Sequence, residues 1–475
     1  MEDARERPRT PRALWAATRT RAARAALLAA LVGLGAGCDG SRDAGAAPPG
    51  GAAGEELVVL RPGGATSASA SVQVRRDAVA FVAPGTYRVR GSLPDAGLVV
   101  DSVTSGAVRL ILDGVTVGND AGPALWVRSA EEVFVELAAG TESRLRDGIR
   151  YEVGHAKAER PNAAVFSSAD LAIGGPGTLV VEGRYEDGIA SRGRLRVESG
   201  ALFVTALDDG MRGREGLAID GGEVSVDAGD DALFATRAVV VRGGALLLRS
   251  ADDAVRSDGE ISISGGDLTV ADCYEGLDAA RITIEGGRIA IQSRDDAINA
   301  AGATRRDRAE ARAAGGAGLR RSADRAARGV TIRGGSLVLD ALGDGIDSNF
   351  GAEIAGGTIL VYGPTTDFDS ALDVDRRFTL SGGWLAAGGS APFADAPTPS
   401  GSQPVVAFTF PEPVAAGRTI RLVAPDGSEA ASYRSPRPVE SLVFSASGLP
   451  TEGPLRAEVD GTAIATASPR AAPAD

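Results

Sequence analysis

Seven short segments of the chain share one order of residues: an acid, then a small residue, then an apolar residue. The apolar members follow one another at steps of 22, 22, 22, 22, 21 and 48 residues; they are Ile189, Met211, Leu233, Val255, Leu277, Ile298 and Ile346. The acids two positions earlier are Asp187, Asp209, Asp231, Asp253, Glu275, Asp296 and Asp344. This period predicts that the acids stack into one file beside inward-packed apolar side chains.

A file of carboxylates needs a counterion. Two carboxylates one strand spacing apart repel by roughly 1 kcal/mol in water, and by about 3–4 kcal/mol at an effective dielectric constant of about 20. Calcium accepts about six to eight oxygen ligands in flexible geometry, so we expect Ca²⁺ to neutralise the file. The alternative is that the acids are turn residues that hydrogen-bond local backbone amides and point into solvent.

A second column follows the apolar residues by one position. The later repeats place Asp278, Asn299, Asp347 and Asp373 there, whereas the earlier repeats have Ala190, Arg212, Phe234 and Arg256. The most complete calcium sites are therefore expected between Glu275 and Asp373. The predicted metal ligands are Asp187, Asp209, Asp231, Asp253, Glu275, Asp278, Asp296, Asn299, Asp344 and Asp347.

Glycine pairs recur with nearly the same period and indicate how the acids are positioned. The pairs begin at Gly221, Gly243, Gly265, Gly286, Gly334, Gly356 and Gly382. Alternating apolar residues flank each pair, which is typical of short strands with one buried face. Such strands bury little as hairpins, but three of them per repeat fill the interior of a solenoid. The sequence therefore predicts an all-β fold, a right-handed parallel β-helix with about 22 residues per coil, over residues 56–390.

Other segments interrupt or follow this repeat. Residues 301–328 form an arginine- and alanine-rich insertion, which we expect to be a solvated loop or a short exposed helix. Residues 391–403 are rich in proline and serine and are expected to be a linker. Residues 404–468 again alternate, and they predict a small β element that caps the C-terminal coil, because an open coil end exposes unpaired strand edges.

The first 38 residues indicate export. A long arginine-rich stretch precedes a short apolar segment at 25–37, which ends at Cys38. This arrangement is similar to a bacterial lipoprotein signal, in which the cysteine becomes the lipidated first residue; the alternative is an ordinary signal peptide that is removed by cleavage. Residues 39–55 read as a flexible linker. We therefore expect a lipid-anchored protein of the cell envelope or surface, whose membrane contact is made through Cys38.

Composition excludes several classes of function. The net charge of −13 disfavours binding to nucleic acid, which requires basic surface. Two cysteines allow one disulfide at most, so the fold is not a disulfide scaffold. The single histidine, His155, lies outside the regular coils, so no Ser-His-Asp group can form in them.

Several motifs resemble those of a known family. They are Gly85–Val89, Gly122–Leu125, Pro161–Phe166, the acid series from Asp187 to Asp296, and Gly343–Asn349. Together they resemble the calcium-containing, carbohydrate-binding parallel β-helix family typified by a clostridial surface protein that binds cellulose and polygalacturonate. Its architecture is similar to that of pectate lyases. The resemblance implies glycan binding, calcium and surface display, and it covers roughly residues 56–385.

The sequence leaves three functions open. Carbohydrate binding is favoured, with an acidic polysaccharide such as polygalacturonate, because few aromatic residues remain to stack on crystalline cellulose; Tyr185 and Tyr274 are the candidate sugar contacts. A polysaccharide lyase would need a basic group beside the metal, and Arg212 and Arg256 stand at the right column for that role. The third function is a structural or adhesive surface protein without catalysis.

Overall fold

The computed structural model describes residues 54–151, 160–300, 328–366, 368–392, 394–401 and 403–471. The predicted export signal with Cys38, nearly all of the linker at 39–55, and nearly all of the insertion at 301–328 lie outside the described residues. The described residues form strands and turns only, so no helix among them could cross a membrane.

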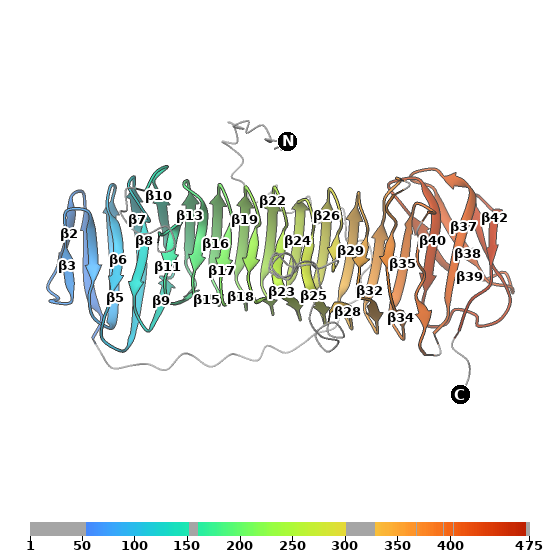
Figure 1. Cartoon of the computed structure of the whole chain (residues 1–475), viewed down its shortest axis with the longest axis horizontal. Coiled ribbons are helices and arrows are strands. Elements are labelled where there is room, and N and C mark those ends of the chain that lie inside the picture. The colour runs from blue at the N-terminus through green and yellow to red at the C-terminus, as the bar shows by residue number, and fades with distance from the viewer. Residues whose placement is uncertain are drawn as a thin grey trace, which may run out of the picture. The chain divides into compact units, whose positions relative to one another are not determined.

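Most strands belong to a parallel β-helix whose coils follow one another along one axis (Figure 1). Met211 pairs with Leu233, and Leu233 pairs with Val255, so each of these coils advances the chain by 22 residues. The predicted all-β fold and its coil length are confirmed.

Each coil contributes short strands to three faces. The first face contains β4 (Ala78–Phe81), β6 (Gly97–Asp101), β8 (Leu125–Ser129), β11 (Ala163–Ser167), β14 (Asp187–Ser191), β17 (Met211–Gly213), β20 (Leu233–Ala235), β27 (Ile298–Asn299), β30 (Ile346–Ser348) and β33 (Leu372–Val374). The second face contains β1 (Glu56–Arg61), β9 (Glu132–Leu137), β12 (Asp170–Gly174), β15 (Arg194–Val197), β18 (Gly216–Ile219), β21 (Ala238–Val241), β28 (Gly329–Ile332), β31 (Ala352–Ile354), β34 (Phe378–Leu380) and β36 (Thr398–Pro399).

The third face contains β10 (Glu142–Asp147), β13 (Thr178–Gly183), β16 (Ala201–Ala206), β19 (Glu223–Ala228), β22 (Ala245–Ser250), β24 (Asp267–Asp272), β26 (Arg288–Ser293), β29 (Ser336–Ala341), β32 (Thr358–Tyr362) and β35 (Trp384–Gly389). Four longer strands bend from one face to the next; they are β5 (Gly85–Leu93), β7 (Ala107–Asn119), β23 (Val255–Ile263) and β25 (Leu277–Ile284).

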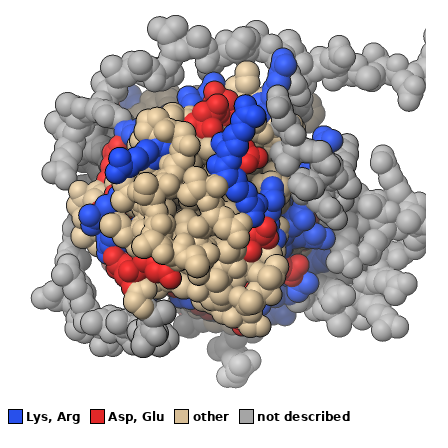
Figure 2. Space-filling view, turned by 90° about the vertical axis from the view of Figure 1, so that its left-hand side faces the viewer, with Lys and Arg blue, Asp and Glu red and all other residues tan. Residues whose placement is uncertain are grey.

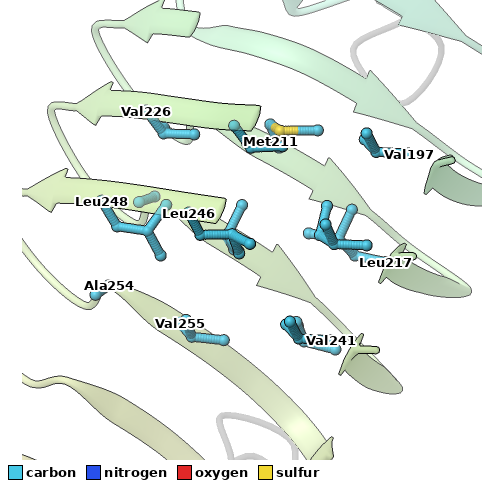
Figure 3. Close-up of a cluster of buried hydrophobic side chains, with 14 of the residues drawn as sticks. Val197, Met211, Leu217, Val226, Val241, Leu246, Leu248, Ala254 and Val255 are labelled. Atoms are coloured by element: carbon cyan, nitrogen blue, oxygen red, sulfur yellow. The ribbon is translucent and has the colours of Figure 1, made fainter. Parts of the chain in front are cut away.

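The core is the interior of the coil stack. Alternate residues of each strand point inward, so β19 and β22 each bury three of their six residues. Figure 3 shows side chains from neighbouring coils, among them Val226, Leu248 and Val255, packed inside the helix. Apolar residues at one coil position therefore form ladders along the axis, as the columns of the sequence predict.

The glycine pairs are required by the backbone of the neighbouring coil. The second glycine of each pair adopts a left-handed conformation, for example a φ of 87° at Gly266. A Cβ built on Gly266 would lie 2.9 Å from the carbonyl carbon of Gly243 and 2.9 Å from the oxygen of Gly244. The pair thus satisfies both the turn and the close stacking of coils.

Antiparallel strands cover both ends of the coil stack. At the N-terminal end, β2 (Gly64–Ser67) pairs with β1 and β3 (Val72–Val74) pairs with β4. Figure 2 looks onto this end, where uncharged side chains fill the centre and charged ones gather around it. At the other end, β40 (Val439–Ser445) pairs with β35, and β37 (Val405–Val414) pairs with β40.

A separate four-stranded sheet completes the C-terminal element. It consists of β39 (Glu429–Arg434), β38 (Thr419–Val423), β41 (Leu455–Val459) and β42 (Thr462–Ala467). The Tyr433 hydroxyl donates a 2.8 Å hydrogen bond to the Val361 carbonyl, which ties this sheet to the last coils. The segment expected to be a linker at 391–403 contains β36, which pairs with β34 and so still belongs to the coil stack.

The stacking role of the glycine pairs can be tested with two glycines that share a φ of 87°. Gly63 has open space around it, so Gly63→Ala should cost only the left-handed conformation, about 1–2 kcal/mol of unfolding free energy. Gly266→Ala should add about 1–3 kcal/mol from overpacking against the next coil. Equal losses in urea unfolding of the two variants would contradict the requirement for close coil packing.

Candidate functional site

The acids of the file lie in the turns that lead from the third face to the first. Asp209, for example, stands between the end of β16 at Ala206 and the start of β17 at Met211. The small residue after the acid is needed because the next coil lies against it: a Cβ on Gly210 would approach Val226 Cγ1 to 2.2 Å. The packing of neighbouring coils at this corner therefore explains why a small residue follows each acid.

The carboxylates are buried. The six aspartates of the file are between 0% and 8% exposed, and Glu275 is half-buried. The alternative that these acids are solvated turn residues is therefore wrong, because the turns hold their side chains under the neighbouring coils.

Backbone amides satisfy one oxygen of most aspartates. The Asp209 and Asp253 amides donate to Oδ1 of the preceding rungs, Asp187 and Asp231, at 3.3 Å and 3.1 Å. Farther along, the Asp344 amide donates to Asp296 Oδ1 at 2.7 Å. The Ser370 amide donates to Asp344 Oδ1 at 2.5 Å, and Ser370 ends the file with a neutral side chain. Part of the alternative interpretation is thus right, since these acids do bind backbone amides, although the amides belong to the next coil.

Burial and neighbouring carboxylates raise the pKa values of the file. Burial, followed by the charges of Asp253 and Asp209, raises the pKa of Asp231 to about 9. Burial is also the main cause at Asp253 and Asp296, whose pKa values rise to about 8. The charged form of this corner is thus unfavourable without a cation.

Arginines supply part of the missing positive charge. Arg212 Nη1 lies 3.5 Å from Asp209 Oδ2 and 3.9 Å from Asp187 Oδ2. Arg256 Nη1 lies 3.7 Å from Oδ2 of both Asp231 and Asp253. Both candidate lyase residues are therefore engaged with acids of the file.

Among the residues that the structure describes, four groups of carboxylates could each hold a metal ion, because one oxygen from each member lies within 4.8 Å of the others. The groups are Asp209–Asp230–Asp231, Asp231–Asp252–Asp253, Asp253–Glu275–Asp278 and Asp296–Asp344–Asp347. Eight of the ten predicted ligands fall into these groups, together with two further acids, Asp230 and Asp252, that the sequence analysis did not select. The signal for these two was present in the doubled acids of their turns.

The group formed by Asp296, Asp344 and Asp347 fits a hard divalent cation best. Asp296 and Asp344 are buried, and Asp347 is half-buried. Within the described part of the chain, no arginine forms an ion pair with any of the three. Burial raises the pKa of Asp344 to about 7 and that of Asp347 to about 6. Three close carboxylates without a protein cation supply oxygen ligands of the kind that hard divalent cations take.

Of the predicted ligands in and beside the file, Asp187 and Asn299 do not join a group of three acids. Asp187 stands at its N-terminal end, where Asn162 Nδ2 donates a 2.7 Å hydrogen bond to Asp187 Oδ2. Asn299 forms a side-chain hydrogen bond with Glu275, which opposes the rise of the Glu275 pKa caused by burial. Asp373 pairs in register with Asp347 on the first face.

The two candidate sugar contacts do not form one platform. The Tyr185 ring stacks on Tyr151 at a centroid distance of 4.3 Å, which occupies one of its faces. Tyr274 is 44% exposed, and hydrogen bonding to Asp295 raises its pKa to about 12. Tyr274 thus offers the more open ring beside the later half of the file.

One buried acid at this corner escaped the sequence analysis. Asp147 is 0% exposed; its Oδ1 accepts a 2.6 Å hydrogen bond from the Arg184 amide, and its Oδ2 accepts one of 2.7 Å from the Tyr151 hydroxyl. The order Asp147-Gly148-Ile149 matches the recurring motif. Ile149, however, is 63% exposed, so this segment does not pack inward as the later ones do.

The fold and this corner define a β-solenoid protein with a buried file of carboxylates. A sequence profile for carbohydrate-binding domain-containing proteins matches residues 75–316, which is about half of the chain. The chain belongs to this family.

Two known proteins illustrate the relationship. A carbohydrate-binding domain-containing protein of Acetivibrio thermocellus is 33% identical over 128 residues, which are 27% of this chain and 45% of that protein's length. The chain thus spans less than half of that relative. The solved structure of a polysaccharide lyase-like protein from C. thermocellum, a gadolinium derivative, aligns at 25% identity and a TM-score of 0.42, covering 50% of this chain and 95% of that one.

The raised pKa values predict a pH dependence of stability in chelator. In the unfolded chain these acids lose their protons near pH 4. In the folded chain they keep them to higher pH, and Asp231 ionises only near pH 9. The unfolded chain therefore binds fewer protons between these values, and the melting temperature should fall as pH rises from about 5 to about 9.

Asp231→Asn keeps an oxygen for the Asp253 amide and should flatten this fall. Asp267→Asn, which removes an exposed partner of Arg288, serves as the control and should keep the wild-type slope. A slope that is the same in all three proteins would contradict the assignment of the pH dependence to the file.

Proposed function

We propose that the chain is an exported, calcium-dependent carbohydrate-binding protein that recognises an acidic polysaccharide such as polygalacturonate. Membership of the carbohydrate-binding family supports the class of ligand. The carboxylate file supports the cation, and the observation that carries the proposal is the group Asp296–Asp344–Asp347, whose oxygens lie within 4.8 Å of one another.

The charges around this group favour calcium. Two of its three acids are buried, the third is half-buried, and none has an arginine partner among the described residues, so at neutral pH they need protons or a metal ion. Asp296, Asp344 and Asp347 would hold the ion, and a bound calcium would supply positive charge for the carboxylate of a uronic acid. Glu275 and Asp278 belong, with Asp253, to a second group of carboxylates one coil earlier, which differs in that Arg256 lies beside it.

An acidic glycan fits the surface beside this group when metal is present. The outward column of the first face continues from Asp278 through Asn299 and Asp347 to Asp373. A carboxylated polymer would be repelled by these acids and by the net charge of −13 unless cations lay between them. Binding of an acidic glycan should therefore require calcium, whereas binding of a neutral glycan should not.

The arginines argue for binding without catalysis. Burial lowers the pKa of Arg256, but the charges of Asp231, Asp253 and Asp278 outweigh this effect and raise it. An arginine held in its charged form by three acids is a poor general base. We therefore favour a binding protein over a lyase, and incubation with polygalacturonate and calcium should produce no ultraviolet absorbance from an unsaturated product.

Export and a lipid anchor at Cys38 complete the proposal, and they rest on the basic and apolar segments before that cysteine. Cys38→Ser should release the protein from membranes of the producing cell into the soluble fraction. Retention of the variant in the membrane fraction would contradict the lipid anchor, but it would not contradict the proposed calcium binding.

Calcium should stabilise the folded chain through the group Asp296–Asp344–Asp347. At a hundredfold excess of calcium over its Kd the expected gain is about 2.7 kcal/mol, visible as a higher melting temperature than in chelator. Asp344→Asn keeps an acceptor for the Ser370 amide but removes a charged ligand, so most of the calcium-dependent shift should be lost. Asp227→Asn, at an exposed position of β19, should keep the full shift. The proposal fails if calcium leaves the wild-type melting temperature unchanged.

Glycan binding can be tested by sedimentation with insoluble polygalacturonate. We expect retention of the wild-type protein with calcium, release in excess chelator, and weak retention of Asp344→Asn at any calcium concentration. Crystalline cellulose is the uncharged comparison and should retain less protein. Retention that chelator does not alter would contradict calcium-dependent recognition, and no retention on either glycan would favour a structural or adhesive role.

A further inference from the structure

The carboxylate file has two halves that differ in their counterions. The column beside it on the first face is in continuous register through Trp126, Phe166, Ala190, Arg212, Phe234, Arg256, Asp278, Asn299, Asp347 and Asp373. Arginines therefore stand beside the earlier acids of the file, and oxygen-bearing side chains stand beside the later ones. The two halves meet between Arg256 and Asp278.

Arg212 lies beside the first two acids of the file, Asp187 and Asp209. Its Nη1 lies 3.5 Å from Asp209 Oδ2 and 3.9 Å from Asp187 Oδ2, and both of these carboxylates are buried. The Arg212 side chain itself is 40% exposed, so the guanidinium covers the two rungs from the solvent side.

Arg256 lies beside the next two acids of the file and beside Asp278, the first acid of the neighbouring column. Its Nη1 lies 3.7 Å from Oδ2 of both Asp231 and Asp253, and its Nε lies 3.9 Å from Asp278 Oδ2. The Arg256 side chain is only 11% exposed, so its charge is held inside the corner. One arginine is thus present for every two acids in this half of the file.

An aromatic ring holds the two guanidinium groups in place. Phe234 lies between Arg212 and Arg256 in the strand register. The guanidinium carbons of these arginines lie 5.1 Å and 5.9 Å from the centre of its ring, within the range of cation–π attraction. Phe234 therefore limits the freedom of both arginines to swing away into solvent.

The arginine contacts resemble charge neutralisation more than tight pairing. Distances of 3.5–3.9 Å exceed those of charge-assisted hydrogen bonds, whereas Arg242 Nη1 reaches Asp220 Oδ1 at 2.6 Å on the second face. Arg212 stands beside an oxygen of the group Asp209–Asp230–Asp231, and Arg256 stands beside oxygens of the groups Asp231–Asp252–Asp253 and Asp253–Glu275–Asp278. A divalent ion at the same oxygens would be repelled by the neighbouring guanidinium.

We propose that Arg212 and Arg256 are tethered counterions that keep divalent metal off the earlier rungs of the file and confine it to Asp296–Asp344–Asp347. The arginines thereby determine where the metal binds and how many ions the chain takes. The identity of the ion as calcium rests on the proposed function, but the competition between guanidinium and metal does not.

The test compares metal stoichiometry in arginine variants of the full chain, by equilibrium dialysis against calcium with elemental analysis. Arg256→Gln should bind one more ion than the wild type, because the two groups that it frees share Asp253. Arg256→Lys keeps a positive charge and should bind the wild-type number. Arg242→Gln, which breaks an ion pair on the second face, is the matched control and should also bind the wild-type number.

A second measurement, the melting temperature, takes account of any stability that the variant loses. Arg256→Gln should melt below the wild type in chelator, and calcium should raise its melting temperature by more than it raises that of the wild type. If Arg256→Gln does not fold, Arg212→Gln provides the same comparison at a more exposed site, where it removes the guanidinium beside Asp209 of the group Asp209–Asp230–Asp231. The additional ion should disappear in the double variant Arg256→Gln, Asp253→Asn.

The outcomes separate this proposal from the proposed function. An ion gained by Arg256→Gln when the wild type binds none would overturn the calcium-dependent function and support the tethered counterions. Equal numbers of ions in the wild type and in both glutamine variants would overturn the counterion proposal while calcium binding stands. Absence of metal from all the proteins would overturn both.

Discussion

The mutual repulsion of buried carboxylates, stacked one coil apart, is the constraint on which the chemistry of this protein depends. The strand register fixes their spacing, because the apolar residue two positions after an acid pairs in a parallel sheet with its counterpart in the next coil, as Ile189 does with Met211 and Met211 with Leu233. The acids cannot move apart without breaking these ladders. Backbone amides take up one oxygen of most aspartates, arginines compensate some of the charge, and the balance must come from protons or from a bound cation.

The fold could be predicted because its signals are local and repeated. Alternating apolar residues and paired glycines specify short strands and tight turns, and repetition specifies that they stack. The structure adds the reason for the second glycine, which is the approach of the neighbouring backbone at positions such as Gly266. The antiparallel pairing at the C-terminal end is harder to derive, since β35 and β40 join residues far apart in the sequence.

The site could be predicted only in part. The file itself follows from the register, so Asp209, Asp253 and Asp296 lie where the period places them. The contribution of Asp230 and Asp252 depends on the path of each turn, which decides whether an outer acid comes within reach of its neighbours. The direction of a long arginine side chain is also invisible in a sequence, and so is the exposure of Ile149, which leaves Asp147 outside the regular pattern.

The equivalence of Arg256 and Asp278 in neighbouring coils has an evolutionary consequence. Both stand at the same place on the first face, and neither contributes to the apolar interior. With Arg256 in the proposed role of a counterion, replacing this one residue by an acid would convert a coil that carries its own cation into one that binds a cation from the medium. Descendants of such a gene would then adjust their dependence on the mineral content of their surroundings coil by coil, while the interior that keeps the chain folded stays the same.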